Sequence, residues 1–152
     1  MGMHAGYPFV VVAALALAAC GNEPVSPSDA FVLPERERGV LETSASKGDI
    51  DAIRQLIAHY EALSGSDDLA EKWKAKARDL GDSKQLYYYA ASKYAAALRE
   101  EDPARRREML VEALAAATRA DEAGSSSSSK KLILDLKREM EVDGKLSMGN
   151  RG

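Results

Sequence analysis

The sequence predicts an all-α protein built from antiparallel α-hairpin repeats, and three observations support this class. After residue 45 the strong helix formers alanine, leucine, glutamate, lysine and arginine dominate, while β-branched residues and phenylalanine are scarce. Apolar side chains recur at helical spacing through this part of the chain. The breaks between the periodic stretches are short, so consecutive helices must lie antiparallel. We therefore expect a short solenoid of about five helices.

The first element is a leader at residues 1–19. An uncharged apolar run from Phe9 to Leu17 is followed by the small residues Ala18 and Ala19. The run is shorter than the roughly 20 apolar residues that a transmembrane helix needs, and its length is typical of a secretory signal peptide. We expect this leader to be cleaved from the mature protein.

The single cysteine, Cys20, directly follows the leader. One cysteine cannot form an internal disulfide, and with only His4 and His59 it cannot complete the usual set of zinc ligands. Its position at the end of the leader therefore needs another explanation.

The four residues Leu17-Ala18-Ala19-Cys20 resemble the lipobox of bacterial lipoproteins. The resemblance implies cleavage before Cys20, lipidation of its thiol and anchoring in a membrane. Gly21 follows where an aspartate would imply retention in the inner membrane, so the resemblance favours the periplasmic face of the outer membrane. Residues 1–8 depart from the family because they contain no lysine or arginine. The alternative is an ordinary signal peptide, or a buried helix, with an incidental free cysteine.

Residues 20–33 are expected to form a lipidated, flexible tether. They contain Pro24 and Pro27 with several small polar residues, and they show little apolar periodicity. A flexible chain of this length spans on the order of 20 Å, which would hold the folded domain just above the lipid.

The helical domain is expected at residues 34–143, and its first two helices meet at Gly48. Pro34 suits the first position of a helix with a weak apolar face, which Gly39 interrupts. Asp49 can cap the second helix by accepting backbone N–H groups. The apolar face of the first helix is Val40, Leu41 and Ala45, and that of the second is Ile50, Ile53, Leu56, Ile57, Tyr60 and Leu63.

The next two helices are separated by Gly81. Asp68 and Glu71 have the spacing of a capping box for the third helix, and Asp82 with Gln85 has it for the fourth. The buried stripe of the third helix is expected to be Leu69, Trp73, Ala77 and Leu80. That of the fourth is expected to be Leu86, Tyr89, Ala90, Lys93 and Ala97.

Asp102 and Pro103 predict the start of a fifth helix, which Gly124 ends. The serine run at residues 125–129 is interpreted as a low-complexity connector to a last amphipathic helix, and residues 144–152 as a frayed tail. The inner face of the fifth helix is expected to be Met109, Leu110, Ala113, Leu114 and Ala117. That of the last helix is expected to be Leu132, Ile133, Leu136 and Met140.

The pairs Gly48-Asp49 and Gly81-Asp82 lie 33 residues apart, a period typical of stacked helical hairpins. Small and apolar residues recur in the pattern Ala45-x-x-Gly48-x-x-x-Ala52-x-x-x-Leu56-x-x-x-Tyr60, followed by Gly65, Ala70, Trp73 and Ala77. This pattern resembles a Sel-one-like repeat, a relative of tetratricopeptide repeats. Only residues 45–81 carry the pattern well, because Gln85, Tyr89 and Lys93 replace its alanine, leucine and tyrosine in the second unit. An irregular helical bundle is the alternative.

Charge and motifs exclude several classes of function. The chain holds 21 basic and 24 acidic residues, a net charge of −3, and the leader contributes to neither count. A mildly acidic mature protein lacks the basic excess of nucleic-acid binders. We find no catalytic constellation and no loop with the spacing of a calcium or phosphate site, so we expect neither an enzyme nor a bound cofactor or metal.

The run Tyr87-Tyr88-Tyr89 is the first candidate for a partner-binding surface. Successive side chains on a helix point about 100° apart, so one face cannot bury all three rings, and at least one should be partly exposed. Exposed tyrosines are favoured anchors in protein recognition. We take Tyr87, Tyr88 and Tyr94 as candidates. The alternative is that two rings pack on neighbouring helices and the third covers a turn.

Arg105 and Arg106 are a second candidate, as a site for an acidic partner. They belong to a run of three arginines in the first turn of the fifth helix, where the helix dipole disfavours cations. A solvated face balanced by the preceding acidic residues is favoured over a binding site. His59 lies one position off the apolar stripe of its helix and is expected at the surface or its boundary.

The sequence therefore predicts a membrane-anchored periplasmic lipoprotein that binds another envelope protein through its helical repeats, as the family resemblance implies. One alternative is an immunity protein that neutralises a secreted toxin. A minor alternative is an enzyme with dispersed carboxylates and no recognisable motif.

Overall fold

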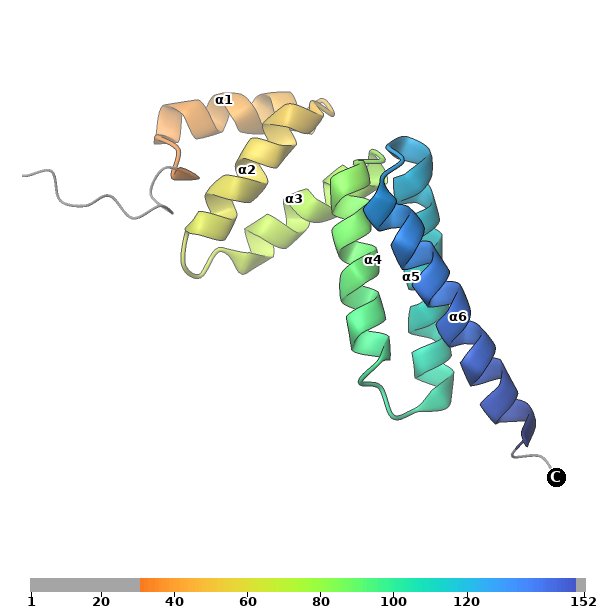
Figure 1. Cartoon of the computed structure of the whole chain (residues 1–152). Coiled ribbons are helices and arrows are strands. Elements are labelled where there is room, and N and C mark those ends of the chain that lie inside the picture. The colour runs from red at the N-terminus through yellow and green to blue at the C-terminus, as the bar shows by residue number, and fades with distance from the viewer. Residues whose placement is uncertain (1–30, 150–152) are drawn as a thin grey trace, which may run out of the picture.

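The computed structural model describes residues 31–149, and these residues form six α-helices and no strand (Figure 1). The all-α class is confirmed, and the number of helices is close to the expected number of about five. The leader, Cys20 and most of the expected tether lie outside the described residues. The helices are α1 (Glu35–Ser46), α2 (Ile50–Ala62), α3 (Asp67–Asp79), α4 (Ser83–Ala97), α5 (Pro103–Ala123) and α6 (Ser127–Gly149).

Three of the predicted helix starts are confirmed by side-chain caps. The carboxylate of Asp49 accepts hydrogen bonds from the second and third N–H groups of α2, that of Asp82 accepts one from Gln85, and that of Asp102 accepts one from Ala104. Gly48 and Gly81 adopt φ angles of 94° and 83°, in the left-handed region that favours glycine. The two Gly-Asp pairs thus make the same kind of turn into a new helix.

Other boundaries differ from the prediction. The residue that precedes α3 is Ser66 rather than Asp68, and its side chain makes no capping bond. Helix α6 begins inside the serine run because the Ser126 hydroxyl accepts the N–H of Ser129, while the buried Ser129 hydroxyl bonds to Asp121. It continues to Gly149, beyond residue 143, where the helical domain was expected to end.

The six helices form two groups of three (Figure 1). Helices α1 and α3 both pack on α2, and helices α4 and α6 both pack on α5. Contact between α3 and α4 is much smaller, and it follows the turn at Gly81. The fold is therefore a row of antiparallel hairpins with a narrow junction in the middle.

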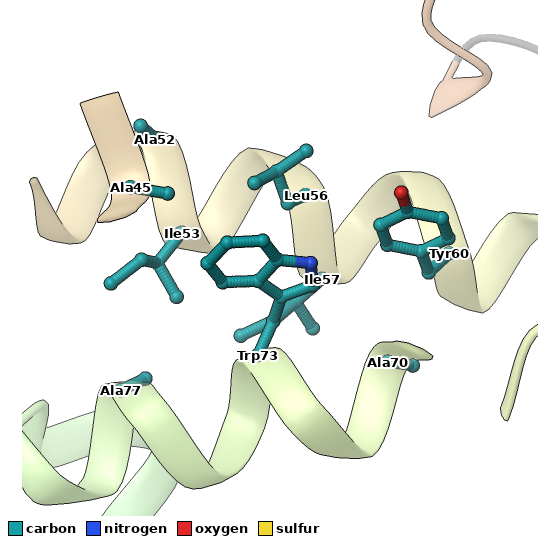
Figure 2. Packing of buried hydrophobic residues seen from close by; sticks show 9 residues of the cluster. All are labelled: Ala45, Ala52, Ile53, Leu56, Ile57, Tyr60, Ala70, Trp73 and Ala77. Atoms are coloured by element: carbon teal, nitrogen blue, oxygen red, sulfur yellow. The ribbon is translucent and has the colours of Figure 1, made fainter. Parts of the chain in front are cut away.

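The first core lies between α1, α2 and α3, with Trp73 at its centre (Figure 2). The indole reaches from α3 toward Leu56 and Ile57 of α2. Leu69 and Leu80 were expected in this core but are about half exposed, at 43% and 45%, because α3 buries only the face that it turns to α2. The core residues are Ala45, Ala52, Ile53, Leu56, Ile57, Tyr60, Ala70, Trp73 and Ala77.

The second core lies between α4, α5 and α6 and is dominated by alanine. Five buried alanines combine with three leucines, and the rings of Tyr87, Tyr89 and Tyr94 pack around them in part. The core residues are Ala90, Ala97, Leu110, Ala113, Ala116, Ala117, Leu132 and Leu136. Across residues 31–149, none of the helices combines the length and apolarity required to cross a bilayer.

Candidate binding groove

A groove of about 520 Å³ lies where the two groups of helices meet. Its walls come from three helices, so it exists only because the turn at Gly81 sets α4 against the hairpin of α2 and α3. The lining residues are Arg54, Ile57, Ala58 and Glu61 from α2, Glu71, Lys74 and Arg78 from α3, and Lys84, Gln85, Tyr88, Tyr89 and Ser92 from α4.

The side chains on its α2 and α3 walls are mostly tied to one another. Lys74 of α3 forms ion pairs with Glu61 at 2.8 Å and with Glu71 at 3.0 Å. The hydrogen bond to Glu61 is the largest cause that raises the pKa of Lys74 above its ordinary value, and the bond to Glu71 raises it further. The ammonium group and the two carboxylates are thus committed to the α2–α3 hairpin.

Arg54 joins the two groups of helices at the junction. Its guanidinium donates to the carboxylate of Asp82 from Nε at 2.8 Å and from Nη2 at 2.7 Å. The Asp82 side chain is fully buried and also caps α4. A buried carboxylate needs such partners, so Asp82 fixes the start of α4 against α2.

Tyr89 forms a fixed aromatic surface on the α4 wall. Its hydroxyl donates a hydrogen bond to the carboxylate of Glu112 on α5. This hydrogen bond is the largest cause that raises the pKa of Tyr89, and burial is the second. Glu112 also pairs with Lys93 at 2.7 Å. The guanidinium carbon of Arg78 lies 4.5 Å from the centre of the Tyr89 ring, within the range of a cation–π interaction.

Tyr88 is the most exposed tyrosine of the run, at 52%, and its ring lines the groove. The ammonium group of Lys84 lies 5.8 Å from the centre of this ring. Within residues 31–149, neither Lys84 nor Arg78 has an acidic partner within 4.0 Å. The groove therefore combines two tyrosine rings of α4 with two cations, Lys84 of α4 and Arg78 of α3, that form no ion pair with a carboxylate of the described residues.

The other predicted tyrosines do not line this groove. Tyr87 is half-buried against the second core and borders a shallow hollow at the corner of α4, α5 and α6. Tyr94 also packs on that core, and burial raises its pKa. The expectation that one ring of the run is exposed is confirmed for Tyr88, while Tyr87 and Tyr94 pack mainly on neighbouring helices.

The two predicted arginines lie near the N-terminal end of α5. Arg105 is exposed and lies 4.0 Å from the carboxylate of Asp102. Arg106 forms ion pairs with Glu139 and, at 3.5 Å, with Asp143, both on α6. The Arg106 guanidinium thus joins α5 to α6, and neither arginine lines the groove.

His59 is buried, which corrects the expectation of a surface position. Only 2% of the residue is exposed, and Nδ1 accepts the backbone N–H of Leu33 at 3.0 Å. The chain entering α1 covers this part of α2, a long-range contact that the local helix pattern does not contain. The Nε2 atom is buried without a hydrogen-bond partner among the described residues.

Sequence reasoning did not identify Arg54, Lys74, Arg78 or Lys84 as site residues. The one local signal is the spacing of Lys84 and Tyr88, which are four residues apart on one helix and therefore share a face. The other cations come from α2 and α3, and only the tertiary arrangement places them opposite α4. Over residues 31–149, no group of three or more potential metal ligands is present.

Comparison with known proteins gives no match, whether with family models, with curated proteins or with solved structures.

Proposed function

We propose that the chain is a periplasmic lipoprotein, anchored through Cys20, that binds an acidic segment of another envelope protein in the groove between α2, α3 and α4. The observation that carries the binding proposal is a pair of cations, Arg78 and Lys84, which lie beside the rings of Tyr89 and Tyr88 and form no ion pair among residues 31–149. The lipobox resemblance of Leu17-Ala18-Ala19-Cys20 supports the anchor and the outer-membrane location.

The chemistry of the groove favours a peptide that carries carboxylates. Arg78 can donate two parallel hydrogen bonds to one carboxylate, and Lys84 supplies a mobile point charge close by. The faces of the tyrosine rings offer apolar area of low conformational entropy to the rest of the segment. The amide of Gln85 and the hydroxyl of Ser92 also line the groove and can bond to a peptide backbone.

The size of the groove favours a short segment over a whole domain. Its volume of about 520 Å³ lies within the range of sites that enclose a small ligand or a few side chains. The ion pairs of Arg54 and Lys74 hold the opposite wall in place, so the site is preformed. A partner therefore inserts a loop or terminus rather than docking a broad face.

The test uses the mature chain and two fluorescent peptides of equal length, one of glutamate and glycine and one of glutamine and glycine. We expect the acidic peptide to bind about tenfold more tightly, since charge complementarity and charge-assisted hydrogen bonds act on it alone. The double variant Arg78→Glu/Lys84→Glu should lose this preference. Fluorescence anisotropy at low and at physiological salt measures both affinities.

The matched control is the double variant Arg107→Glu/Lys130→Glu, which changes the net charge equally at two exposed positions outside the groove. It should keep the preference for the acidic peptide. Equal loss in both double variants would show a general charge effect and contradict a site in the groove. Equal binding of the two peptides to the unaltered protein would contradict an acidic ligand.

The anchor is tested separately by mass spectrometry of the mature protein and by the variant Cys20→Ala. We expect the mature chain to begin at an acylated Cys20 and the variant to leave the membrane fraction. A mature chain that begins elsewhere, or a variant that stays in the membrane fraction, would contradict the lipoprotein proposal.

A further inference from the structure

We infer that the protein also rests on lipid through its N-terminal end, by an apolar patch made of Phe31, Val32 and Val40. This inference rests on the proposed function, because it requires the acylated Cys20. It adds a second contact between the folded domain and the membrane, beyond the lipid chains themselves.

The patch is exposed to an unusual degree for apolar side chains. Phe31 is 57% exposed, Val32 is 40% exposed and Val40, which the sequence predicted on the inner face of its helix, is 63% exposed. Val40 also borders an open hollow of about 450 Å³ with Leu33 and Leu41. Leu33 directly follows Phe31 and Val32 in the chain, so this hollow places Val40 close to the segment that carries the other two exposed side chains.

His59 holds this surface in place. Its buried Nδ1 atom accepts the N–H of Leu33, and this bond ties the segment before α1 to α2. Pro34 follows directly and restricts the backbone of Leu33 to extended conformations. Phe31 and Val32 are thus presented by the folded domain and are not simply the end of a tether.

The distance to the anchor singles out lipid as the occupant. Phe31 lies eleven residues after Cys20. Such a segment reaches about 40 Å when fully extended and on the order of 20 Å as a flexible coil. The patch is therefore the part of the described fold that follows the anchor most closely along the chain, and acylation keeps the bilayer surface at a high effective concentration around it.

The composition of the patch also suits the membrane surface. A phenylalanine and two valines can enter the boundary between headgroups and acyl chains, and the exposed Arg36 beside them can stay among the phosphates. A stable dimer needs about 800 Å² from each partner, which is more than three side chains supply. A second copy of the chain is thus a poor occupant.

The experiment places one fluorophore on the acylated protein in vesicles of phosphatidylethanolamine and phosphatidylglycerol. Acylation removes the only native thiol, so the variant Val40→Cys carries a unique label. The matched control is Leu98→Cys, at a residue of similar exposure that follows α4 in the other group of helices. Brominated acyl chains quench fluorophores that enter the bilayer.

We expect brominated lipid to quench the label at position 40 at least about twofold more than the label at position 98, as for an interfacial apolar contact. The added substitutions Phe31→Ser and Val32→Ser should reduce this difference. Equal quenching at both positions in acylated protein would overturn the inference.

Two further outcomes would overturn it in favour of another occupant. Shielding of the label at position 40 that depends on the number of proteins per vesicle would indicate a second copy. Shielding that is already complete in the Cys20→Ala protein without vesicles would indicate that residues 20–30 cover the patch. Mass spectrometry of the same sample separates these results from a failure of the anchor, because an unacylated protein would contradict the proposed function first.

Discussion

The two groups of helices build their cores from side chains of different size. Helices α1 to α3 have 12 or 13 residues each and pack around one indole and several branched aliphatic side chains. Helices α4 to α6 have 15, 21 and 23 residues and pack mainly through alanine. Small residues allow helix backbones to approach closely, so the second group gains its contacts along a long interface rather than at one centre.

This difference predicts opposite responses to substitution. The first core is filled by a few large side chains, so it should be most sensitive to substitutions that make one of these side chains smaller. The second core depends on small side chains that let α4 and α5 approach closely, so it should be most sensitive to substitutions that make a buried side chain larger.

The largest effect is expected from Trp73→Ala. This change removes the central side chain of the first core and should lower the free energy of unfolding by about 3–5 kcal/mol. Urea denaturation followed by circular dichroism measures the loss. Leu69→Ala on the same helix is the control, and because Leu69 is 43% exposed it should cost far less.

Hydrogen exchange locates the damage in the Trp73→Ala variant. Amides of α2 and α3 should exchange faster, while those of α5 and α6 should keep most of their protection. Equal acceleration in both groups would contradict the division into two cores.

A smaller loss is expected from Ala117→Leu. Ala117 is fully buried in the second core, and three additional carbon atoms at this position should cost about 1–3 kcal/mol through displaced helices or strained rotamers. Thermal unfolding measures the change. The control Ala115→Leu adds the same atoms at an exposed position of α5 and should leave the melting temperature nearly unchanged. A neutral Ala117→Leu variant would mean that α4 and α5 are not closely packed.

The smallest effect concerns pH. Hydrogen bonds from Lys93 and then Tyr89 hold the pKa of Glu112 below its ordinary value. The pKa of this carboxyl is thus lower in the folded state than in the unfolded state, so its contribution to stability is present above the unfolded pKa and is lost as the pH falls through the folded pKa. The side chain is 42% exposed, so solvent screening limits this contribution to less than about 1 kcal/mol.

The variant Glu112→Gln tests this contribution. It should be less stable than the unaltered protein at neutral pH and should approach it in acid, when both lack the charge. Chemical denaturation across the acid range measures the difference. Glu108→Gln, at an exposed position of the same helix, should follow the unaltered protein at every pH. A constant difference between Glu112→Gln and the unaltered protein at all pH values would contradict a role for the charge.

Local features of the fold could be predicted from the sequence. The caps at Asp49, Asp82 and Asp102 depend on residues within three positions along the chain, and the structure shows all three. The all-α class follows from composition and periodicity, which are also local. Trp73 was predicted in the core because a large apolar side chain at helical spacing has few alternatives.

Features that depend on distant elements were missed. Leu69 and Leu80 are apolar residues at helical spacing, but only a neighbouring helix packed against them could bury them. The burial of His59 depends on Leu33, which is 26 residues away. The groove depends on the angle between two helix groups, and no pattern within one helix encodes that angle. An exposed ring in the run of three tyrosines could be predicted, whereas its identity as Tyr88 and the presence of Arg78 in the same groove could not.

The junction at Asp82 has a mechanical consequence. The walls of the groove belong to different cores, and the pair of Arg54 and Asp82 spans them, with only limited further contact between α3 and α4. Under the proposed function, in which the N-terminal end is anchored and a partner binds against α4, a pull on the partner passes to the anchor through this junction. A bound segment that touches both walls adds a further noncovalent link between the two cores beside the Arg54–Asp82 ion pair, so we expect the filled groove to keep its shape under a larger load than the empty groove does.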